Sequence, residues 1–279
     1  MKAFLGMGLL GSNFVKAMIN KGETVQVWNR TASKSAIPGA RPFADVKDAV
    51  RGATMVHLTL KDDDSVDEVL TAAEAGLMPG ALIIDHTTTS KEGAIRRTAY
   101  WKEKGFIYQH APVFMGPINA LESTGIMLLS GDEKVIDRVY PHLSPMTGQL
   151  INFGPEVGKA AAMKLAGNAF LVCLTAGLRD TLVLSNALDI SLYDLLTLFD
   201  NWNPGAGVSS RLKRMTTADH SQPSWGLNMA RKDTRLFLDT AGNNMVLMPV
   251  IAQLMDKLIA QGMGGMDWTV MGKDLVKLD

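Results

Sequence analysis

Near its start the sequence reads Lys2-Ala3-Phe4-Leu5-Gly6-Met7-Gly8-Leu9-Leu10-Gly11, an apolar run followed by glycines in the spacing Gly-x-Gly-x-x-Gly. At this spacing the first glycine allows a tight turn after a β-strand, the second lets a bound group approach the backbone, and the third lets the following helix pack closely. The N-terminus of that helix presents backbone N–H groups to a phosphate. The stretch therefore predicts a strand, a turn and a helix that bind the diphosphate of a dinucleotide through residues 6–11.

The end of the second predicted strand indicates which dinucleotide is bound. Thr24-Val25-Gln26-Val27-Trp28 is followed by Asn29-Arg30-Thr31, where NAD-binding proteins usually carry an acidic residue for the ribose hydroxyl. No carboxylate is present here, and the guanidinium of Arg30 is able to bind a 2′-phosphate through two parallel hydrogen bonds. Asn29, Thr31 and either Ser33 or Lys34 offer further donors. The pattern favours NADP over NAD; the alternative is that Arg30 only lies on a surface loop.

The chain divides into two parts of different pattern. Residues 1–155 alternate short apolar or β-branched runs with helical patterns, which is typical of a parallel sheet with crossover helices. Residues 156–279 carry helical patterns alone. The expected fold class is therefore α/β. A Rossmann-type, doubly wound parallel sheet forms the N-terminal domain (1–155), and an all-helical C-terminal domain (156–279) serves substrate binding and dimerisation.

The same patterns place the individual elements. Strands are predicted near 2–5, 24–28, 41–43, 54–60, 81–85, 106–110, 126–130 and 148–152. Helices of the first domain are predicted near 10–21, 45–51, 64–76, 90–104 and 132–143. Helices of the second domain are predicted near 156–187, 191–201, 206–217, 226–243, 246–262 and 267–277. Asp62-Asp63-Asp64 is interpreted as a solvated loop that opens a helix.

Composition and charge narrow the possible partners. Of 279 residues, 28 are basic and 28 acidic, so no net field draws the chain to nucleic acid or to an anionic membrane surface. No run of about 18 apolar residues without a charge is present, which argues against a membrane span. The only cysteine, Cys173, lies among apolar neighbours and is predicted to be a small buried residue. We expect a soluble cytoplasmic protein that binds neither nucleic acid nor membrane.

One lysine stands out in the apolar helix that opens the second domain. From Ala160 to Thr175, Lys164 is the only ionisable side chain apart from the cysteine, and Asn168 follows at i+4 on the same helical face. A helix this apolar is expected to be largely buried, so the ammonium finds partners or has a pKa lowered by desolvation. Both outcomes suit a proton-transfer group. The alternative is that Lys164 extends to the surface past small alanines.

Together these residues resemble the β-hydroxyacid dehydrogenase family, which includes 3-hydroxyisobutyrate dehydrogenase, tartronate semialdehyde reductase and glyoxylate/succinic semialdehyde reductases. The resemblance covers essentially the whole chain, from Gly6 to Asp267-Trp268. The glycine turn is similar to the family's GxGxMGxxM fingerprint, with Leu10 in place of the first methionine and Phe14 in place of the second. Asn29-Arg30-Thr31 matches the family's NADP-using members.

The resemblance implies roles for residues farther along the chain. Asp85-His86-Thr87-Thr88-Thr89-Ser90 resembles the D-x-S-T motif, although Lys91 replaces its usual downstream proline, and implies that Thr88 lies beside the nicotinamide ribose or the substrate. Gly158-x5-Lys164-x3-Asn168 is similar to the element whose lysine is the general acid/base and whose asparagine helps to hold the substrate. Lys232-Asp233 matches a pair in which the lysine reaches the cofactor across the domain interface and the aspartate supports the substrate site. Leu60, at the end of a predicted strand, is expected to line the cofactor site.

The substrate loop departs from the family. Its usual D-A-P-V-S-G-G sequence, in which the serine hydroxyl and glycine amides receive a carboxylate, is replaced by His110-Ala111-Pro112-Val113-Phe114-Met115-Gly116. Phe114 removes a hydroxyl donor and Met115 removes the backbone freedom of a glycine, so a more apolar pocket is expected. The alternative is that the amide of Gly116 still binds an acid. His110 is interpreted as structural, with a titrating role left open. The expected substrate residues are Thr88, Val113, Phe114, Met115, Gly116, Lys164, Asn168 and Asp233.

These residues predict an NADP-dependent oxidoreductase without a metal. A hydride moves between the nicotinamide and the carbonyl or carbinol carbon of a small β-hydroxyacid, semialdehyde or keto acid, while Lys164 transfers the proton of the oxygen. An imine reductase or reductive aminase is an alternative, favoured by Phe114 and Met115 and opposed by Lys164. A non-catalytic NADP-binding sensor is a third alternative. The family resemblance also implies a homodimer or higher homo-oligomer.

Overall fold

The computed structural model describes residues 1–217 and 219–276. Two compact units are present, Met1–Ala169 and Phe170–Asp279. The predicted domain boundary after residue 155 stays a prediction.

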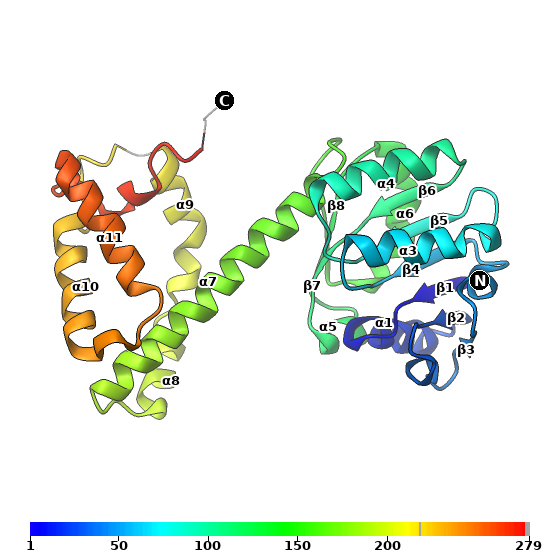
Figure 1. Ribbon diagram of the computed structural model, residues 1–279, viewed down its shortest axis with the longest axis horizontal. Coiled ribbons are helices and arrows are strands. Elements are labelled where there is room, and N and C mark those ends of the chain that lie inside the picture. Colours follow the sequence, from blue (N-terminus) through cyan, green and yellow to red (C-terminus); the bar gives the residue numbers. More distant parts are fainter. Residues whose placement is uncertain (218, 277–279) are drawn as a thin grey trace. The chain divides into compact units, whose positions relative to one another are not determined.

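A six-stranded parallel sheet forms the centre of the first unit (Figure 1). Its strands are β1 (Lys2–Leu5), β2 (Val25–Trp28), β3 (Arg41–Pro42), β4 (Met55–Leu58), β5 (Leu82–Asp85) and β6 (Ile107–His110). They lie in the order β3-β2-β1-β4-β5-β6, which is the doubly wound order of dinucleotide-binding folds. The predicted fold class is confirmed.

Helices cover both faces of this sheet, so its inner strands are buried and mostly apolar. They are α1 (Leu9–Asn20), α2 (Val46–Val50), α3 (Asp63–Ala73), α4 (Lys91–Glu103), α5 (Pro117–Glu122) and α6 (Glu133–Leu143). Short 3₁₀ turns occupy η1 (Ala32–Ser35), η2 (Glu74–Gly76) and η3 (Ser144–Met146). Side chains alternate along β1: Phe4 belongs to the core that includes α1 and α6, whereas Ala3 and Leu5 belong to the core that includes α2 and α3.

A second, three-stranded sheet was not separated from the first by the sequence pattern. It contains β7 (Val113–Phe114), β8 (Ile126–Leu129) and β9 (Gln149–Asn152) in that order. The β7–β8 pair is antiparallel and the β8–β9 pair is parallel. β7 and α5 were not predicted, because two and six residues are too few to show a periodicity.

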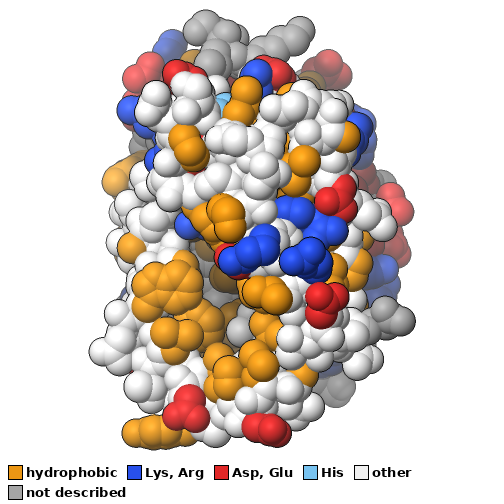
Figure 2. Space-filling view, turned by 90° about the vertical axis from the view of Figure 1, so that its left-hand side faces the viewer, with side chains coloured by type: hydrophobic (Ala, Val, Ile, Leu, Met, Phe, Trp, Pro, Cys, Tyr) orange, Lys and Arg blue, Asp and Glu red, His pale blue; other side chains and the backbone are white. Residues whose placement is uncertain are grey.

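The second unit is helical. Its elements are the C-terminal part of α7 (Lys159–Ala187), α8 (Leu192–Asn201), η4 (Pro204–Gly207), α9 (Val208–Thr217), α10 (Leu227–Ala241), η5 (Gly242–Asn244), α11 (Met248–Leu258), the π-helical turn η6 (Ile259–Met263) and η7 (Trp268–Gly272). The predicted helix at 267–277 is found only as η7, and its last residue lies outside the described residues. Figure 2 shows a face of this unit on which Lys and Arg side chains lie between hydrophobic and acidic ones.

Two buried carboxylates fix loops of the helical unit. Asp180 on α7 accepts hydrogen bonds from the backbone N–H groups that open α11, at 2.8 Å from Val246 and 2.8 Å from Leu247. Asp267 accepts hydrogen bonds from Ser224 N and Thr269 N at 2.7 and 3.1 Å. Both buried carboxylates therefore have backbone N–H groups as hydrogen-bond donors.

The prediction that the apolar helix is buried is wrong for the single chain. α7 is long and apolar enough to cross a membrane by length and composition, yet only 11% of its most apolar window is buried. Cys173 is accordingly exposed, contrary to expectation. An apolar helix is more stable when its surface is covered, but the pattern does not show which surface covers it.

Candidate cofactor and catalytic site

The carboxyl ends of the parallel strands meet along one edge of the large sheet. In the strand register, Leu5 of β1 is opposite Trp28 on one side and Leu58 on the other, and Leu58 is followed by Asp85 and His110. The chain reverses its winding direction between β1 and β4. Open α/β sheets bind ligands outside the carboxyl ends of their strands at such a switch point.

The three glycines after β1 differ in what surrounds them. A methyl group on Gly6, which has φ +95°, would overlap the carbonyl oxygen of Thr59. A methyl group on Gly11 would overlap the carbonyl oxygen of Gly6, so this glycine lets α1 pack on the turn. A methyl group on Gly8 would meet nothing within 4 Å. Gly8 is also the N-cap of α1, and no side chain caps the helix. Uncapped N–H groups at a helix N-terminus are able to bind an anion.

Residues 29–34 follow β2 at the same edge of the sheet. Asn29 uses its side chain within the protein: its Oδ1 accepts from Met7 N at 2.9 Å, and its Nδ2 donates to Thr31 O at 2.9 Å. Arg30, Thr31 and Lys34 are exposed. Neither Arg30 nor Lys34 forms an ion pair with another described residue. Asn29 therefore joins the glycine turn to the end of β2.

Thr88 is the exposed residue of a loop that is otherwise held tightly. Its neighbours Thr87 and Thr89 are buried. The Thr87 hydroxyl accepts from Leu60 N at 2.9 Å, which joins the loop after β5 to the loop after β4. Thr88 thus lies just after the carboxyl end of β5, between two buried neighbours. Its expected place beside the nicotinamide ribose or the substrate stays a prediction.

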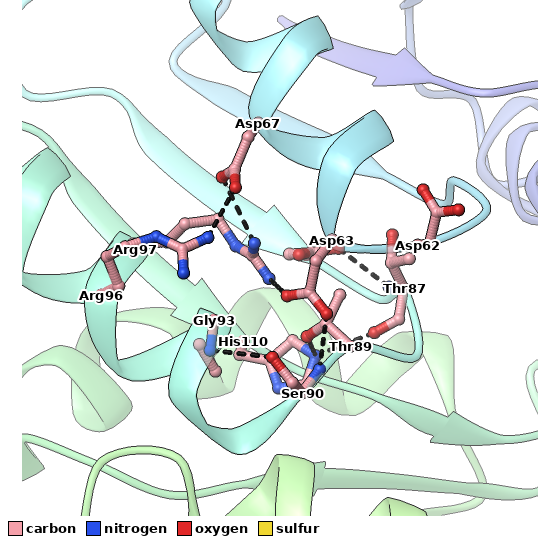
Figure 3. Close-up of polar contacts among 12 residues, drawn as sticks. Asp62, Asp63, Asp67, Thr87, Thr89, Ser90, Gly93, Arg96, Arg97 and His110 are labelled. Carbon is pink, nitrogen blue, oxygen red and sulfur yellow. Dashed lines mark hydrogen bonds and ion pairs between the residues drawn. The ribbon is translucent and has the colours of Figure 1, made fainter.

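A chain of polar contacts holds this loop; Figure 3 shows the part of it in which Asp63 joins Arg97 to Ser90. Asp85 accepts from Thr87 N at 2.8 Å and from the hydroxyl of Tyr108 at 2.6 Å. Arg97 Nε donates to the same hydroxyl at 3.1 Å, and its guanidinium pairs with Asp63. Asp63 in turn accepts from the backbone N–H of the residue that caps α4. Burial and the neighbouring Asp85 carboxylate raise the pKa of Tyr108 well above its ordinary value, so the phenol stays protonated and donates.

Sequence reasoning did not find this chain of contacts. Asp63 was interpreted as solvated, and Arg97 lies in a helix of polar pattern although it is only 2% exposed. The available signal was the position of Asp85 and Tyr108 on adjacent predicted strands. Their pairing with a helix residue depends on the fold.

His110 lies under the loop. Its Nε2 is 2.8 Å from Thr87 O and 3.2 Å from Thr89 Oγ1, so it donates to the carbonyl. Burial lowers the pKa of His110. Its Nδ1 has no hydrogen-bond partner among the described residues. These contacts agree with the structural interpretation of His110.

Two further histidines are buried inside the sheet. His86 Nδ1 lies 2.8 Å from Ala111 O, and its Nε2 lies 3.1 Å from His57 Nδ1. The His86 ring stacks on Phe14, with ring centroids 5.3 Å apart. Burial lowers the pKa of His86 to about 4 and that of His57 well below its ordinary value, so both rings are neutral at neutral pH.

Lys164 is buried, although most of its helix is exposed. Its side chain is 8% exposed, and Nζ donates to Asn168 Oδ1 at 2.9 Å. The ring of Phe114 lies against the ammonium, with its centroid 4.1 Å from Nζ. Burial lowers the pKa of Lys164. Of the two alternatives for this lysine, the structure has the buried one with a partner.

The residues of the 113–116 loop face different ways. Val113 is buried in the core, and Met115 packs against the same core. The N–H of Gly116 donates to Asn119 Oδ1 at 2.8 Å. Of the four expected substrate residues in this loop, Phe114 alone has a side chain in contact with Lys164 among the contacts of the described residues.

The remaining expected residues lie on α10 in the other unit. Lys232 Nζ is 2.7 Å from Asp233 Oδ1, and both side chains are partly exposed. Their roles toward cofactor and substrate stay predictions. Among the described residues, no group of three or more His, Cys, Asp or Glu side chains is arranged to hold a metal ion.

Comparison with known proteins gives the family. The model for the NAD-binding domain of 6-phosphogluconate dehydrogenase matches residues 2–154, which is the sheet and the glycine turn described above. The chain belongs to the β-hydroxyacid dehydrogenase family. It is thus an NAD(P)-dependent oxidoreductase, and the predicted family and enzyme class are confirmed.

Family members of known name resemble the chain over most of its length. The 3-sulfolactaldehyde reductase of Escherichia coli is 28% identical, with 96% of this chain and 93% of the relative covered. A probable 3-hydroxyisobutyrate dehydrogenase of Mycobacterium tuberculosis is 29% identical, with 70% and 68% covered. Among solved structures, an imine reductase from Myxococcus stipitatus in complex with NADP+ has a TM-score of 0.87 at 22% identity, with 97% and 98% covered. At that identity the likeness concerns the fold alone.

Proposed function

We propose that this β-hydroxyacid dehydrogenase uses NADPH to reduce the carbonyl group of a small aldehyde or keto compound to an alcohol, with Lys164 as the general acid. Semialdehydes and keto acids are the compounds that the family resemblance suggests. The observation that carries the proposal is the hydrogen bond between the buried Lys164 and the partly buried Asn168. An ammonium held at 2.9 Å from an amide oxygen, with its pKa lowered by burial, gives up a proton more readily than an exposed lysine does.

In the proposed reaction, different residues of the chain bind the cofactor and transfer the proton. A bound nicotinamide supplies the hydride. Gly8 and the N-terminus of α1 receive the diphosphate, and Thr88 presents its side chain beside the reacting groups. Lys164 Nζ gives its proton to the carbonyl oxygen in reduction and takes it back in oxidation, while Asn168 fixes the direction of Nζ.

The proposed preference for NADPH rests on the end of β2. Arg30 and Lys34 are exposed cations without an ion-pair partner among the described residues, and no carboxylate follows β2 to repel a 2′-phosphate. In kinetics with a responsive aldehyde, we expect kcat/KM to be higher with NADPH than with NADH. Arg30→Ala should reduce that ratio about 10-fold, the value of one lost charge-assisted bond. Arg51→Ala, at an exposed arginine that follows α2, is the control. An unmodified enzyme that uses NADH equally well contradicts the preference.

The role of Lys164 is tested on the same helix. Lys164→Ala should lower kcat by about 10²- to 10⁴-fold, the usual contribution of a positioned acid, while NADPH still binds. Lys159→Ala removes an exposed lysine five residues earlier on α7 and should leave kcat unchanged. A Lys164→Ala enzyme with normal kcat contradicts the assignment.

A second candidate is the reduction of a C=N bond. The apolar ring of Phe114 beside Lys164 favours it, because such a surface accommodates an uncharged imine. The retained lysine favours the carbonyl reaction. Turnover of a cyclic imine with NADPH, without turnover of any aldehyde or keto acid, would establish the imine reaction instead.

We also propose that a second copy of the chain covers α7 in a homodimer. Its exposed apolar residues, Phe170, Leu171, Val172, Leu174 and Leu178, form a surface that water solvates poorly. Light scattering should then give twice the 30.2 kDa mass of the chain. Leu174→Asp should shift the mass toward that of one chain, and a monomeric unmodified protein contradicts the proposal.

A further inference from the structure

The loop at 113–116 has lost the groups with which the family's sequence pattern would hold a carboxylate. Phe114 stands where a serine hydroxyl is expected. The amide of Gly116 is already bonded to Asn119 Oδ1 at 2.8 Å, and Asn119 Nδ2 donates to Thr124 Oγ1 at 3.0 Å, so the asparagine is itself held. The donor that the sequence left open for an acid is therefore occupied by the protein.

The ring of Phe114 has a place made for it on α7. A methyl group on Gly167 would overlap Phe114 Cζ and lie 2.8 Å from Cε1. The absence of a side chain at this position lets the ring lie against the helix backbone. Gly167 is one turn from Lys164, and the same ring lies 4.1 Å from Lys164 Nζ. Gly167 and Lys164 thus form the part of α7 on which the ring of Phe114 packs.

Met115 does not restore polarity at this point. It is half-buried and packs on the core, beside Gly125, where its Cγ would lie 2.9 Å from an added methyl group. Phe114 is consequently the side chain of the loop that faces Lys164. A carboxylate beside its ring would meet the negative face of the π-system and lose water without gaining a donor from the 113–116 loop.

We propose that Phe114, which packs on Gly167 beside Lys164, makes the enzyme select uncharged carbonyl compounds over acids of the same length. Compounds with a hydrocarbon or ester substituent should have the higher kcat/KM. This inference rests on the proposed carbonyl reduction. The reaction is balanced in the usual way: the aldehyde R–CHO gains a hydride from NADPH at carbon and a proton from Lys164 at oxygen, which yields R–CH₂OH and NADP+. The lysine is reprotonated from water.

The test compares 4-oxobutanoate with its methyl ester, which share the aldehyde and the chain length and differ in the charge. With the unmodified enzyme, kcat/KM should be at least about 10-fold higher for the ester, as expected when a charged group loses a hydrogen-bond partner. Phe114→Ser should reduce that preference about 10-fold or reverse it. Phe114→Leu keeps an apolar side chain and should retain the preference.

A second pair of variants tests the packing of the Phe114 ring on Gly167. Gly167→Ala should displace the ring, lower kcat/KM for the ester and reduce the preference. Gly177→Ala adds the same methyl group farther along α7, where nothing lies within 4 Å, and should retain the preference. Thermal unfolding of each variant shows whether a change in preference occurs in a folded protein.

The outcomes separate this inference from the function on which it rests. Equal or better turnover of the acid by the unmodified enzyme overturns the inference and leaves carbonyl reduction intact. An unchanged preference in a folded Phe114→Ser enzyme overturns it as well. Turnover of neither compound, nor of any other aldehyde or ketone, contradicts the proposed function itself.

Discussion

Replacing Gly8 with alanine separates cofactor binding from folding. Gly8 has φ −72° and ψ −172°, an extended conformation that any L-residue adopts, and an added methyl group meets nothing within 4 Å. The variant should therefore fold normally. Its free energy of unfolding should stay the same or rise by about 0.4–1 kcal/mol, because alanine restricts the unfolded chain.

Cofactor binding should respond in the opposite direction. The diphosphate is expected to approach the backbone at Gly8, so the methyl group displaces it from the N-terminus of α1. The loss of one hydrogen bond to a charged group costs about 1.5–3 kcal/mol. That corresponds to a rise in Kd of roughly 10- to 150-fold, since each 1.4 kcal/mol is a factor of ten. NADPH and NADH should be weakened equally, because both carry the diphosphate.

Gly11→Ala is the matched comparison. Its methyl group would overlap the carbonyl oxygen of Gly6, so α1 must move away from the turn. Overpacking of this kind costs about 1–3 kcal/mol of stability. Isothermal titration gives Kd and urea unfolding gives stability for both variants. A Gly8→Ala protein that binds NADPH as tightly as the unmodified protein, or that loses binding only because it is less stable, would refute the assignment.

Three other results are expected. Arg97→Met should destabilise the protein by about 3–5 kcal/mol in urea unfolding, because it leaves the partners of the buried guanidinium uncompensated. Arg96→Met removes an exposed ion pair and should cost under about 1 kcal/mol. Equal losses of stability in the two variants would contradict the contacts assigned to Arg97. His86, whose pKa is lowered to about 4 by burial, binds a proton in the unfolded state below pH 6.5 but not in the folded state, so stability should fall by about 3 kcal/mol from pH 6.5 to 4. A His86→Gln protein should lose less stability between pH 6.5 and 4. If its stability has the same pH dependence as that of the unmodified protein, His86 is not the cause of the loss. Reduction needs the protonated form of Lys164, so kcat should decline with rising pH at an apparent pKa below 10.5; a rate that increases there contradicts its role as acid.

Local sequence was sufficient for the cofactor-binding half of the site. The strand, glycine turn and helix are set by residues adjacent in the chain, so a ten-residue pattern specifies them. Lys164 and Asn168 were likewise predictable as a pair, because residues four apart share a face of any helix. The family assignment followed from these local motifs.

Other parts of the site depend on residues far apart in the sequence. The contact between Arg97 and Tyr108 exists because α4 packs beside β6, and the strand register then places Asp85 beside them. A charged residue in a polar helix gives no sign of such burial. The directions of the Phe114 and Met115 side chains, toward Lys164 and toward the core, were also not predictable, because β7 is only two residues long.

The sequence by itself determined the dinucleotide-binding fold, the enzyme family and the apolar character of α7, since each depends on residue type and short-range spacing. Only the tertiary structure decided that Lys164 is buried, that the N–H of Gly116 is already bonded, and that Gly167 makes room for the ring of Phe114. The physical reason is that burial, partner choice and steric room depend on what the rest of the fold brings to a position, and no local pattern records it.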